Sequence, residues 1–311
     1  MAELEIVAAS PAMRELLVML ERVAQTDANL LIRGESGTGK DLLAQLLHYR
    51  SRRYQAQLIK IDCSTLPQGL LESELFGYER GAFTGAASAK PGRFEVAHGG
   101  TLIFDEIVHL DLQSQAKLLR VIEERAFMRL GGVAAIKIDA RFVTLTNMDL
   151  ALAVARGLLR ADLYHRLNVV ALEIPPLRLR MEDLPGLVNY FLRRAALRHG
   201  KSIETISSEA QSLLASYEFP GNVRELQNII ERAVIVASGN IIGVQHLPDY
   251  MLSATRLIQA HKHQLTLAEL EAIYIREVLV QTRGHKTRAA EILGISRKNL
   301  YEKLKKYRIK L

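Results

Sequence analysis

The chain has 311 residues, of which 49% are hydrophobic, so it is long and apolar enough for two or three globular domains. Its single cysteine excludes an intramolecular disulfide. The sequence has neither a signal-peptide pattern nor an uncharged apolar run of membrane-spanning length, so we expect a cytoplasmic protein without a membrane partner. The formal net charge of +7 is concentrated after residue 283, where nine of the 41 basic residues accompany only two of the 34 acidic ones, and this basic tail indicates a polyanionic partner.

A glycine-rich stretch over 34–41, reading GESGTGKD, is the first motif along the chain. It follows a helix expected over 10–24 and an apolar strand expected over 29–33, and it leads into a helix expected over 40–49. Its glycines let successive backbone N–H groups face phosphate oxygens, and Lys40 adds positive charge at the start of the helix. The pattern predicts a nucleotide site rather than a turn that binds nothing. The candidate residues are Gly34, Glu35, Ser36, Gly37, Thr38, Gly39, Lys40 and Asp41.

Two acidic residues end the second strand expected after the glycine-rich stretch. Asp41 stands where the usual motif has the Ser or Thr that binds magnesium, so either the metal is held elsewhere or the loop is degenerate. After a strand expected over 57–61, an apolar strand over 99–106 ends in Asp105 and Glu106. Because parallel sheets bind ligands at the carboxyl ends of their strands, Asp105 is the candidate Mg²⁺ ligand and Glu106 the candidate base for the attacking water.

The remaining strands of this α/β part are expected over 140–146 and 169–174. The first ends at Asn147, a polar group placed either to sense a γ-phosphate or to cap the following helix, and the residues leave both roles open. The second is closed by two prolines, which cannot continue a central strand, so the α/β domain ends there.

Helical periodicity then continues through 182–250, with no strand of any length. We expect helices over 182–199, 207–217 and 222–237, which together form a small lid. Arg224, early in the third helix, is placed to reach back to the nucleotide and couple the lid to its phosphates.

The basic tail has the spacing of a helix-turn-helix. The stretch over 252–265 is aperiodic, and its two histidines are interpreted as part of a solvated linker rather than as a metal site. A capping box over 266–269 then opens a helix that Gly284 closes. Two short helices follow, separated by Gly294, and the second has a buried stripe and an outward basic face. A recognition helix in the major groove is favoured over a solvated helix. The candidate DNA-binding residues are Arg288, Ser296, Arg297, Lys298, Asn299, Lys303 and Lys306.

A loop inserted before the acidic strand contains the sequence GAFTGA over 81–86. The residues alone indicate only a loop in which glycines bracket an aromatic residue and a threonine, and one interpretation of it is a glycine-rich loop with Phe83 tucked inside. The stretch closely resembles the signature of the bacterial enhancer-binding proteins that activate sigma-54 RNA polymerase. The resemblance extends to GESGTGKD, GGTLIFDEI, FPGNVREL and the Fis-type helix-turn-helix, and so covers nearly the whole chain.

The resemblance implies an AAA+ ATPase that binds ATP and Mg²⁺ and works as a homo-oligomer, from dimer to hexameric ring. It implies that a second loop lies over 129–132 and that an acid after Lys40 is normal for the family. Arg160 and Arg166 are the implied arginine fingers supplied to a neighbour, and Asn147 and Arg224 the implied first and second sensors. The implied contacts with the sigma factor are Gly81, Ala82, Phe83, Thr84, Gly85 and Ala86.

Three departures from the family pattern qualify this expectation. Asp62 stands where relatives commonly have an asparagine that pairs with the catalytic glutamate, and an acid cannot hold Glu106 in the same way unless one of the two is protonated. Phe219 replaces a tryptophan. The chain begins at the ATPase core without a receiver domain, which fits either a short member regulated by a partner in trans or a trimmed piece.

The sequence therefore predicts an α/β AAA+ core with a parallel sheet over 1–178, a helical lid over 179–251, a linker over 252–265 and an all-α Fis-type domain over 266–311. The predicted function is ATP-driven remodelling of the closed sigma-54 RNA polymerase promoter complex from an upstream site on double-stranded DNA. One alternative is a DNA-binding repressor whose AAA+ module serves mainly for oligomerisation. Another is an ATP-driven remodeller of a different protein.

Overall fold

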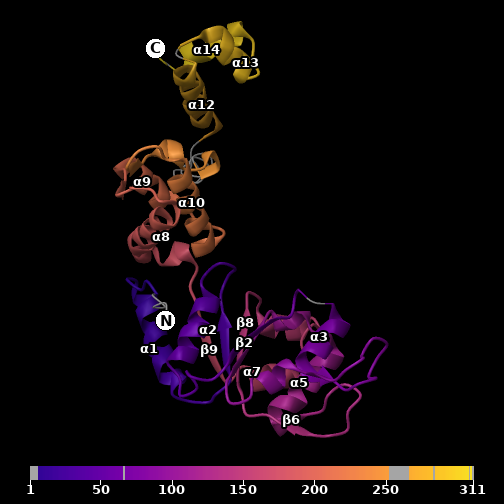
Figure 1. The fold of residues 1–311 in the computed structure, drawn as a ribbon. Coiled ribbons are helices and arrows are strands. Elements are labelled where there is room, and N and C mark those ends of the chain that lie inside the picture. The colour runs from indigo at the N-terminus through magenta and orange to yellow at the C-terminus, as the bar shows by residue number, and fades with distance from the viewer. Residues whose placement is uncertain (1–5, 66, 252–265, 283, 308, 310–311) are drawn as a thin grey trace. The chain divides into compact units, whose positions relative to one another are not determined.

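The computed structural model describes residues 6–65, 67–251, 266–282, 284–307 and 309 (Figure 1). It divides into two compact units, which are described separately. The first comprises Met1–Ser207 with Glu218–His246, and the second Ser208–Tyr217 with Leu247–Leu311. Among the residues described, no helix combines the length and apolarity needed to cross a membrane.

A five-stranded parallel sheet forms the centre of the first unit, in the order β2-β5-β8-β1-β9. The expected strands are confirmed to within two residues at each end. Buried, mostly apolar runs explain the central strands, because a parallel sheet covered on both faces excludes water from both. The strand inserted between β1 and β5 is β8, while β2 lies at the edge. The strands are β1 (Leu30–Arg33), β2 (Leu58–Asp62), β5 (Thr101–Asp105), β8 (Arg141–Thr146) and β9 (Val170–Glu173).

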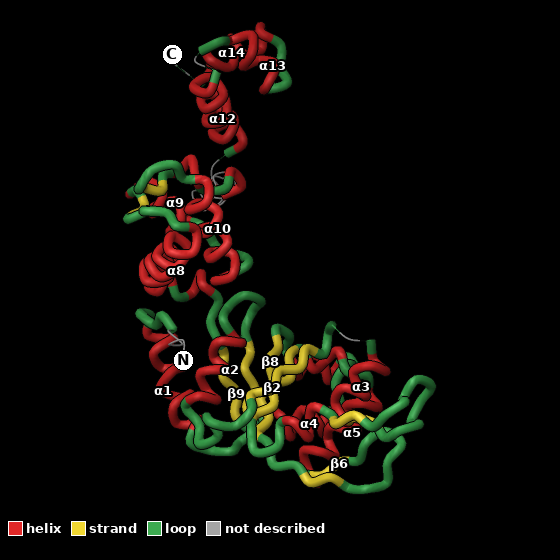
Figure 2. The backbone as a smooth tube through the Cα atoms, viewed as in Figure 1, coloured by secondary structure: helices red, strands yellow, loops and turns green. Residues whose placement is uncertain are grey.

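Helices cover both faces of this sheet (Figure 2). Side chains alternate between the faces along β1, so that Leu30 and Ile32 pack with α1 (Pro11–Ala24) and α2 (Lys40–Tyr49), whereas Leu31 packs on the opposite side. Four of the longer helices contribute to that opposite core, together with an aromatic cluster that includes Phe94 of the short helix α4 (Arg93–Val96). The four longer helices are α3 (Gln68–Phe76), α5 (Leu112–Glu124), α6 (Leu150–Ala155) and α7 (Ala161–Leu167).

Two insertions extend from the sheet. The first runs from α3 through the antiparallel pair β3 (Gly77–Tyr78) and β4 (Lys90–Pro91) to α4 (Arg93–Val96), and the GAFTGA loop connects β3 to β4. The second is the antiparallel pair β6 (Ala126–Phe127) and β7 (Ile136–Lys137). An isolated bridge between Tyr78 and Leu130 joins the two insertions.

The helical lid, residues 177–207 and 218–246, completes the first unit. Its main helices are α8 (Leu184–His199) and α10 (Asn222–Val236), close to the expected spans. The structure adds a feature that was not expected, because β10 (Thr205–Ile206) pairs with β11 (Ile241–Ile242). Two-residue strands are too short to produce a periodic pattern in the sequence. Short 3₁₀ helices lie at Leu177–Leu179, Met181–Asp183 and Val244–His246.

The second unit contains α9 (Ser208–Ser216), which the sequence analysis assigned to the lid, and the three helices of the basic tail. The predicted capping box is confirmed, because Thr266 N donates to Glu269 Oε2 at 2.7 Å and Glu269 N donates to Thr266 Oγ1 at 3.3 Å. The predicted linker, with His261 and His263, lies outside the described residues. The tail helices are α12 (Leu267–Gln281), α13 (Lys286–Ile292) and α14 (Arg297–Lys306), as the spacing predicted.

Candidate nucleotide-binding site

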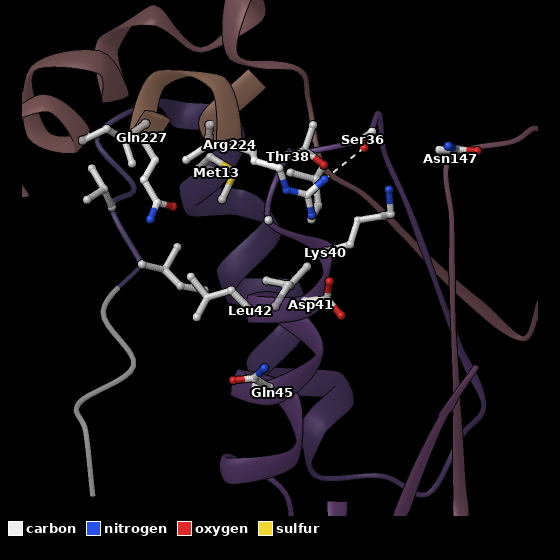
Figure 3. Close-up of a pocket in the computed structure, with 18 of the residues that line it drawn as sticks. Met13, Ser36, Thr38, Lys40, Asp41, Leu42, Gln45, Asn147, Arg224 and Gln227 are labelled. Atoms are coloured by element: carbon white, nitrogen blue, oxygen red, sulfur yellow. Dashed lines mark hydrogen bonds between the residues drawn. The ribbon is translucent and has the colours of Figure 1, made fainter. Parts of the chain in front are cut away.

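A cavity of about 1060 Å³ lies within the first unit, between the carboxyl edge of the sheet and the lid (Figure 3). Its volume is sufficient for a nucleotide. Predicted site residues from four separate parts of the chain meet on its wall, and residues that were not predicted lie beside them. The predicted ones are Ser36, Gly37, Thr38, Gly39, Lys40, Asp41, Asp105, Glu106, Asn147 and Arg224.

The phosphate loop, residues 34–41, has the backbone that its glycines permit. Gly37 and Gly39 have φ angles of 78° and 106°, which side-chain-bearing residues rarely adopt. A Cβ on Gly37 would also lie 2.3 Å from Gly221 O, so the lid packs directly against this backbone. Lys40 opens α2, and its Nζ donates to Gly34 O at 2.7 Å and to Glu35 O at 3.2 Å. Burial lowers the pKa of Lys40, and Glu106, Asp105 and Asp41 oppose that shift.

Glu106 is held at the cavity wall by the end of β8. Its backbone has φ 53°, and its carboxylate accepts hydrogen bonds from Thr146 Oγ1 and from Asn147 N, both at 3.1 Å. Asp62, the residue that departs from the family pattern, accepts instead from Ser64 N at 2.9 Å and Ser64 Oγ at 2.6 Å. These bonds, the side-chain one foremost, lower the pKa of Asp62 and favour its charged form. Glu106 is therefore oriented by β8, while Asp62 is bonded to its own turn.

Asn147 lines the cavity, and the alternative role of helix cap belongs to Asp149. The Asp149 carboxylate accepts from Ala151 N at 2.9 Å and from Leu152 N at 3.3 Å, and so caps α6. The side chain of Asn147 is thus left available to the cavity.

Asp105 lies beside a lysine that the sequence analysis did not single out. Lys60 Nζ is 2.7 Å from Asp105 Oδ2 and also contacts Asp41 Oδ1. Asp105, at the end of β5, and Asp41, in the first turn of α2, therefore share one ammonium group.

The lid holds the phosphate loop through several polar contacts. Arg224, which was predicted, donates from Nη1 to Ser36 Oγ at 3.2 Å (Figure 3). Asn222 was not predicted as a site residue. It is fully buried and donates from Nδ2 to Glu35 Oε2 at 3.0 Å and to Ser36 O at 3.1 Å. The signal available for Asn222 was its place after Pro-Gly in a turn, since asparagine is favoured where the backbone is left-handed, and its φ is 54°.

Two further lid arginines contact the same loop. Arg178 pairs with Glu35 through Nη1 at 2.8 Å and Nη2 at 2.5 Å, and this pairing, with help from Asn222, lowers the pKa of Glu35 to about 2. Arg180 is buried and donates from Nη2 to Thr38 O at 2.8 Å. Loop position and lid position are consequently linked by direct hydrogen bonds.

The two predicted fingers, Arg160 and Arg166, are not among the residues that line the cavity. Arg160 pairs with Asp162 through Nε at 3.1 Å and Nη2 at 2.7 Å, and Arg166 Nε is 2.7 Å from Glu123 Oε1. Within this chain, therefore, neither arginine is brought to the phosphate loop.

The GAFTGA loop is a tight turn with an exposed aromatic ring. Gly81 N donates to Ala86 O at 2.9 Å, which closes the turn. Phe83 is 46% exposed and its ring centroid is 4.9 Å from that of Tyr78, which contradicts the alternative interpretation of a ring tucked inside the loop. The second loop, residues 129–132, packs against this turn, since a Cβ on Gly131 would lie 2.9 Å from the Ala82 Cβ.

The basic helix α14 presents part of its predicted face. Arg297, Lys298, Asn299 and Lys306 are exposed, as is Arg288 on α13. Ser296 Oγ caps α14 by accepting from Asn299 N at 3.2 Å. The prediction that Lys303 is free to face outward is wrong, because its Nζ lies 2.5 Å from Glu271 Oε1 of α12. A periodic pattern shows which residues share a face, but not which of them meets an acid on a neighbouring helix.

Three family models match the chain in sequence order. They are described as the Sigma-54 interaction domain, over residues 6–173; the AAA+ ATPase lid domain, over 178–264; and Bacterial regulatory protein, Fis family, over 266–307. Together they cover the cavity, the lid and the basic tail.

Similar proteins match over nearly the full chain. Regulatory protein AtoC of Escherichia coli is 46% identical over 308 residues, which are 96% of this chain and 67% of that protein. Transcriptional regulatory protein FlbD of Caulobacter vibrioides is 42% identical over 321 residues, with 98% and 70% covered. The crystal structure of NtrX from Brucella abortus in complex with ATP superposes with a TM-score of 0.76 at 33% identity, covering 98% of this chain and 70% of that one.

Proposed function

The chain belongs to the sigma-54-dependent transcriptional activators, and on this premise we propose that it binds and hydrolyses ATP in the cavity between its phosphate loop and its lid. It is an AAA+ ATPase with a Fis-type DNA-binding domain. The observation that carries the proposal is the shared wall of the cavity, where Lys40, Glu106 and Arg224 face one space. Support for the nucleotide comes from NtrX, a similar protein whose structure contains ATP.

The carboxylate chemistry at the edge of the sheet fits Mg²⁺. Among the described residues no group of three or more potential ligands forms a complete metal cage. Such a cage is not required, because Mg²⁺ at nucleotide sites is held by one or two carboxylates, phosphate oxygens and water. Asp105 already has a cation against one of its oxygens, the ammonium of Lys60. Asp105 is the proposed ligand, and the metal would neutralise charge on the phosphates.

Glu106 is the proposed general base. Bonds from Thr146 and Asn147 hold its carboxylate, so residues of the chain itself supply the orientation that a general base needs. Asn147 is proposed to sense the γ-phosphate or the attacking water, and Arg224 to report the phosphate state to the lid. Positioning a water and accepting its proton contributes on the order of 10² to 10⁴ in rate.

The arginine fingers are proposed to act on a neighbouring subunit in a ring. Arg160 and Arg166 lie outside their own cavity, paired with Asp162 and Glu123, so an intermolecular role is the one that their position supports. A finger supplied in trans contributes on the order of 10³ to 10⁵ in rate. Assembly of the ring would therefore switch on hydrolysis.

The output of the cycle is proposed to pass through the GAFTGA loop to sigma-54 RNA polymerase, while α14 holds the protein on upstream DNA. The exposure of Phe83 supports this contact, because an exposed aromatic ring is a typical anchor for a partner protein. We expect Thr84→Ala to abolish transcription from a sigma-54 promoter while ATP hydrolysis persists. Unchanged transcription in that variant would remove the activator mechanism and favour a repressor.

A further inference from the structure

Lys60 lies on β2, the outermost strand of the sheet, next to β5, which ends at Asp105. Its strand pairs with β5 in a register that sets Lys60 beside Ile103 and Asp62 beside Asp105. The side chain reaches along the edge, so that its Nζ lies 2.7 Å from Asp105 Oδ2 and also contacts Asp41 Oδ1. The Lys60 side chain is 39% exposed and that of Asp105 18% exposed, so the contact is partly shielded from water.

Lys40, the lysine that lines the cavity, does not pair with either of these acids. Lys40 Nζ donates to two carbonyl oxygens of the phosphate loop. Of the ion pairs formed by the residues that the structure describes, those of Asp105 and Asp41 both involve Lys60. A divalent cation that approaches Asp105 must therefore do so against the charge of this ammonium, which already occupies one carboxylate oxygen.

We infer that Lys60 is a built-in counter-ion of the metal site, which neutralises Asp105 and Asp41 before nucleotide binds and must release Asp105 when the divalent cation arrives. The inference rests on the metal role proposed above for Asp105. Asp41 then keeps the released ammonium paired, so the acid that follows Lys40 gains a function where the usual motif has a metal-binding hydroxyl. Lys60 weakens the site for divalent cations and makes it respond to their free concentration.

The test is a titration of Mn²⁺, as a substitute for Mg²⁺, into the full chain with one equivalent of ADP, with free Mn²⁺ followed by its electron paramagnetic resonance signal. Replacing Lys60 by methionine removes the competing charge and keeps much of the side-chain volume. We expect Lys60→Met to bind Mn²⁺ about fivefold more tightly, the size expected from releasing one partly exposed ion pair. Lys60→Gln serves as a second variant and should change in the same direction.

Lys117→Met is the matched control. Lys117 Nζ lies 2.8 Å from Glu72 Oε1, and their side-chain exposures of 37% and 21% are close to those of the Lys60–Asp105 pair. Lys117→Met removes an ion pair comparable to Lys60–Asp105 but away from the cavity, so it should leave the Mn²⁺ affinity unchanged. Lys60 variants with wild-type or weaker affinity would overturn the inference.

The variant Asp105→Asn distinguishes a failure of this inference from a failure of the proposed metal-ligand role of Asp105. Loss of Mn²⁺ binding in Asp105→Asn, together with unchanged affinity in both Lys60 variants, would reject the counter-ion role alone. Wild-type Mn²⁺ binding in Asp105→Asn would instead reject Asp105 as the metal ligand, and the inference about Lys60 with it.

Discussion

The side-chain amide of Asn222, in the first turn of lid helix α10, donates to the carboxylate of Glu35 in the phosphate loop at 3.0 Å. The same buried side chain donates to Ser36 O and accepts from Leu177 N at 2.8 Å. One residue thus joins the loop, the lid helix and the segment that connects the lid to the sheet.

Asn222→Ala should destabilise the first unit and weaken nucleotide binding together. It leaves the buried Leu177 N–H unpaired and places alanine in a left-handed conformation, costing about 2 to 4 kcal/mol of unfolding free energy. Asn222→Gly is the control, because it removes the same hydrogen bonds but tolerates the backbone angle. Urea unfolding and ADP titration measure both effects. Equal stability of wild type and Asn222→Gly would show that the bonds contribute nothing.

Thr146→Val should lower the ATP hydrolysis rate while ATP affinity stays near wild type. The hydroxyl of Thr146 orients Glu106, and a misaligned base loses part of its 10²- to 10⁴-fold contribution, so we expect roughly a tenfold loss. Thr146→Ser keeps the hydroxyl and should retain most of the rate. Steady-state kinetics separate the two parameters, and equal rates in the valine and serine variants would contradict an orienting role for this bond.

The Glu35–Arg178 pair should make part of the stability depend on pH. Because the folded pKa of Glu35, about 2, lies below its ordinary value near 4.5, its contribution is present above pH 4.5 and is lost as pH falls towards 2. The stability difference between wild type and Glu35→Gln should shrink over that window. Arg178→Met should remove most of the dependence. Both side chains are about two-fifths exposed, so high salt should reduce the effect. A pH-independent difference would contradict the assignment.

Much of the fold was predictable because its signals are local. The phosphate loop, the strand before Asp105 and the capped helix α14 each depend on residues within about ten positions of one another. The order of strands in the sheet was not evident in the same way, since β8 is inserted between two strands that precede it in sequence.

The contacts that sequence reasoning missed join distant residues. Asn222 and Glu35 are 187 positions apart, and Arg178 and Glu35 are 143 apart. No period or spacing links such pairs, so only the folded chain brings them together. Lys60 was missed for a different reason, because a charged residue at an edge strand has the ordinary appearance of a solvated side chain. The pairing of Lys303 with Glu271 of another helix was equally inaccessible.

On α14, the proposed DNA-binding helix, Lys298 and Lys303 should behave differently. Lys298 is exposed, so Lys298→Met should weaken DNA binding and reduce the log–log salt slope by about 0.9 for one lost phosphate contact. Lys303 is held by Glu271, so Lys303→Met should lower the melting temperature of the tail and leave the slope nearly unchanged. Binding isotherms at several salt concentrations measure both, and an equal loss of slope would show that Lys303 leaves Glu271 to contact DNA.

Glu106→Gln should bind ATP and fail to hydrolyse it. The amide cannot accept the proton of the attacking water, so we expect a loss on the order of 10² or more in rate. Transcription from a sigma-54 promoter should disappear with it. Transcriptional regulation that survived Glu106→Gln would favour the repressor, in which the ATPase serves only for assembly.

The claim that two subunits share each ATPase site is tested most directly by the hydrolysis rate per subunit measured against protein concentration. We predict a steep rise with concentration for the wild type and a rate about 10³-fold lower for Arg160→Ala at every concentration. Arg156→Ala, an exposed arginine of the same region, is the matched control and should follow the wild type. A rate that is independent of concentration and unaffected by loss of Arg160 would contradict the ring and the arginine finger together.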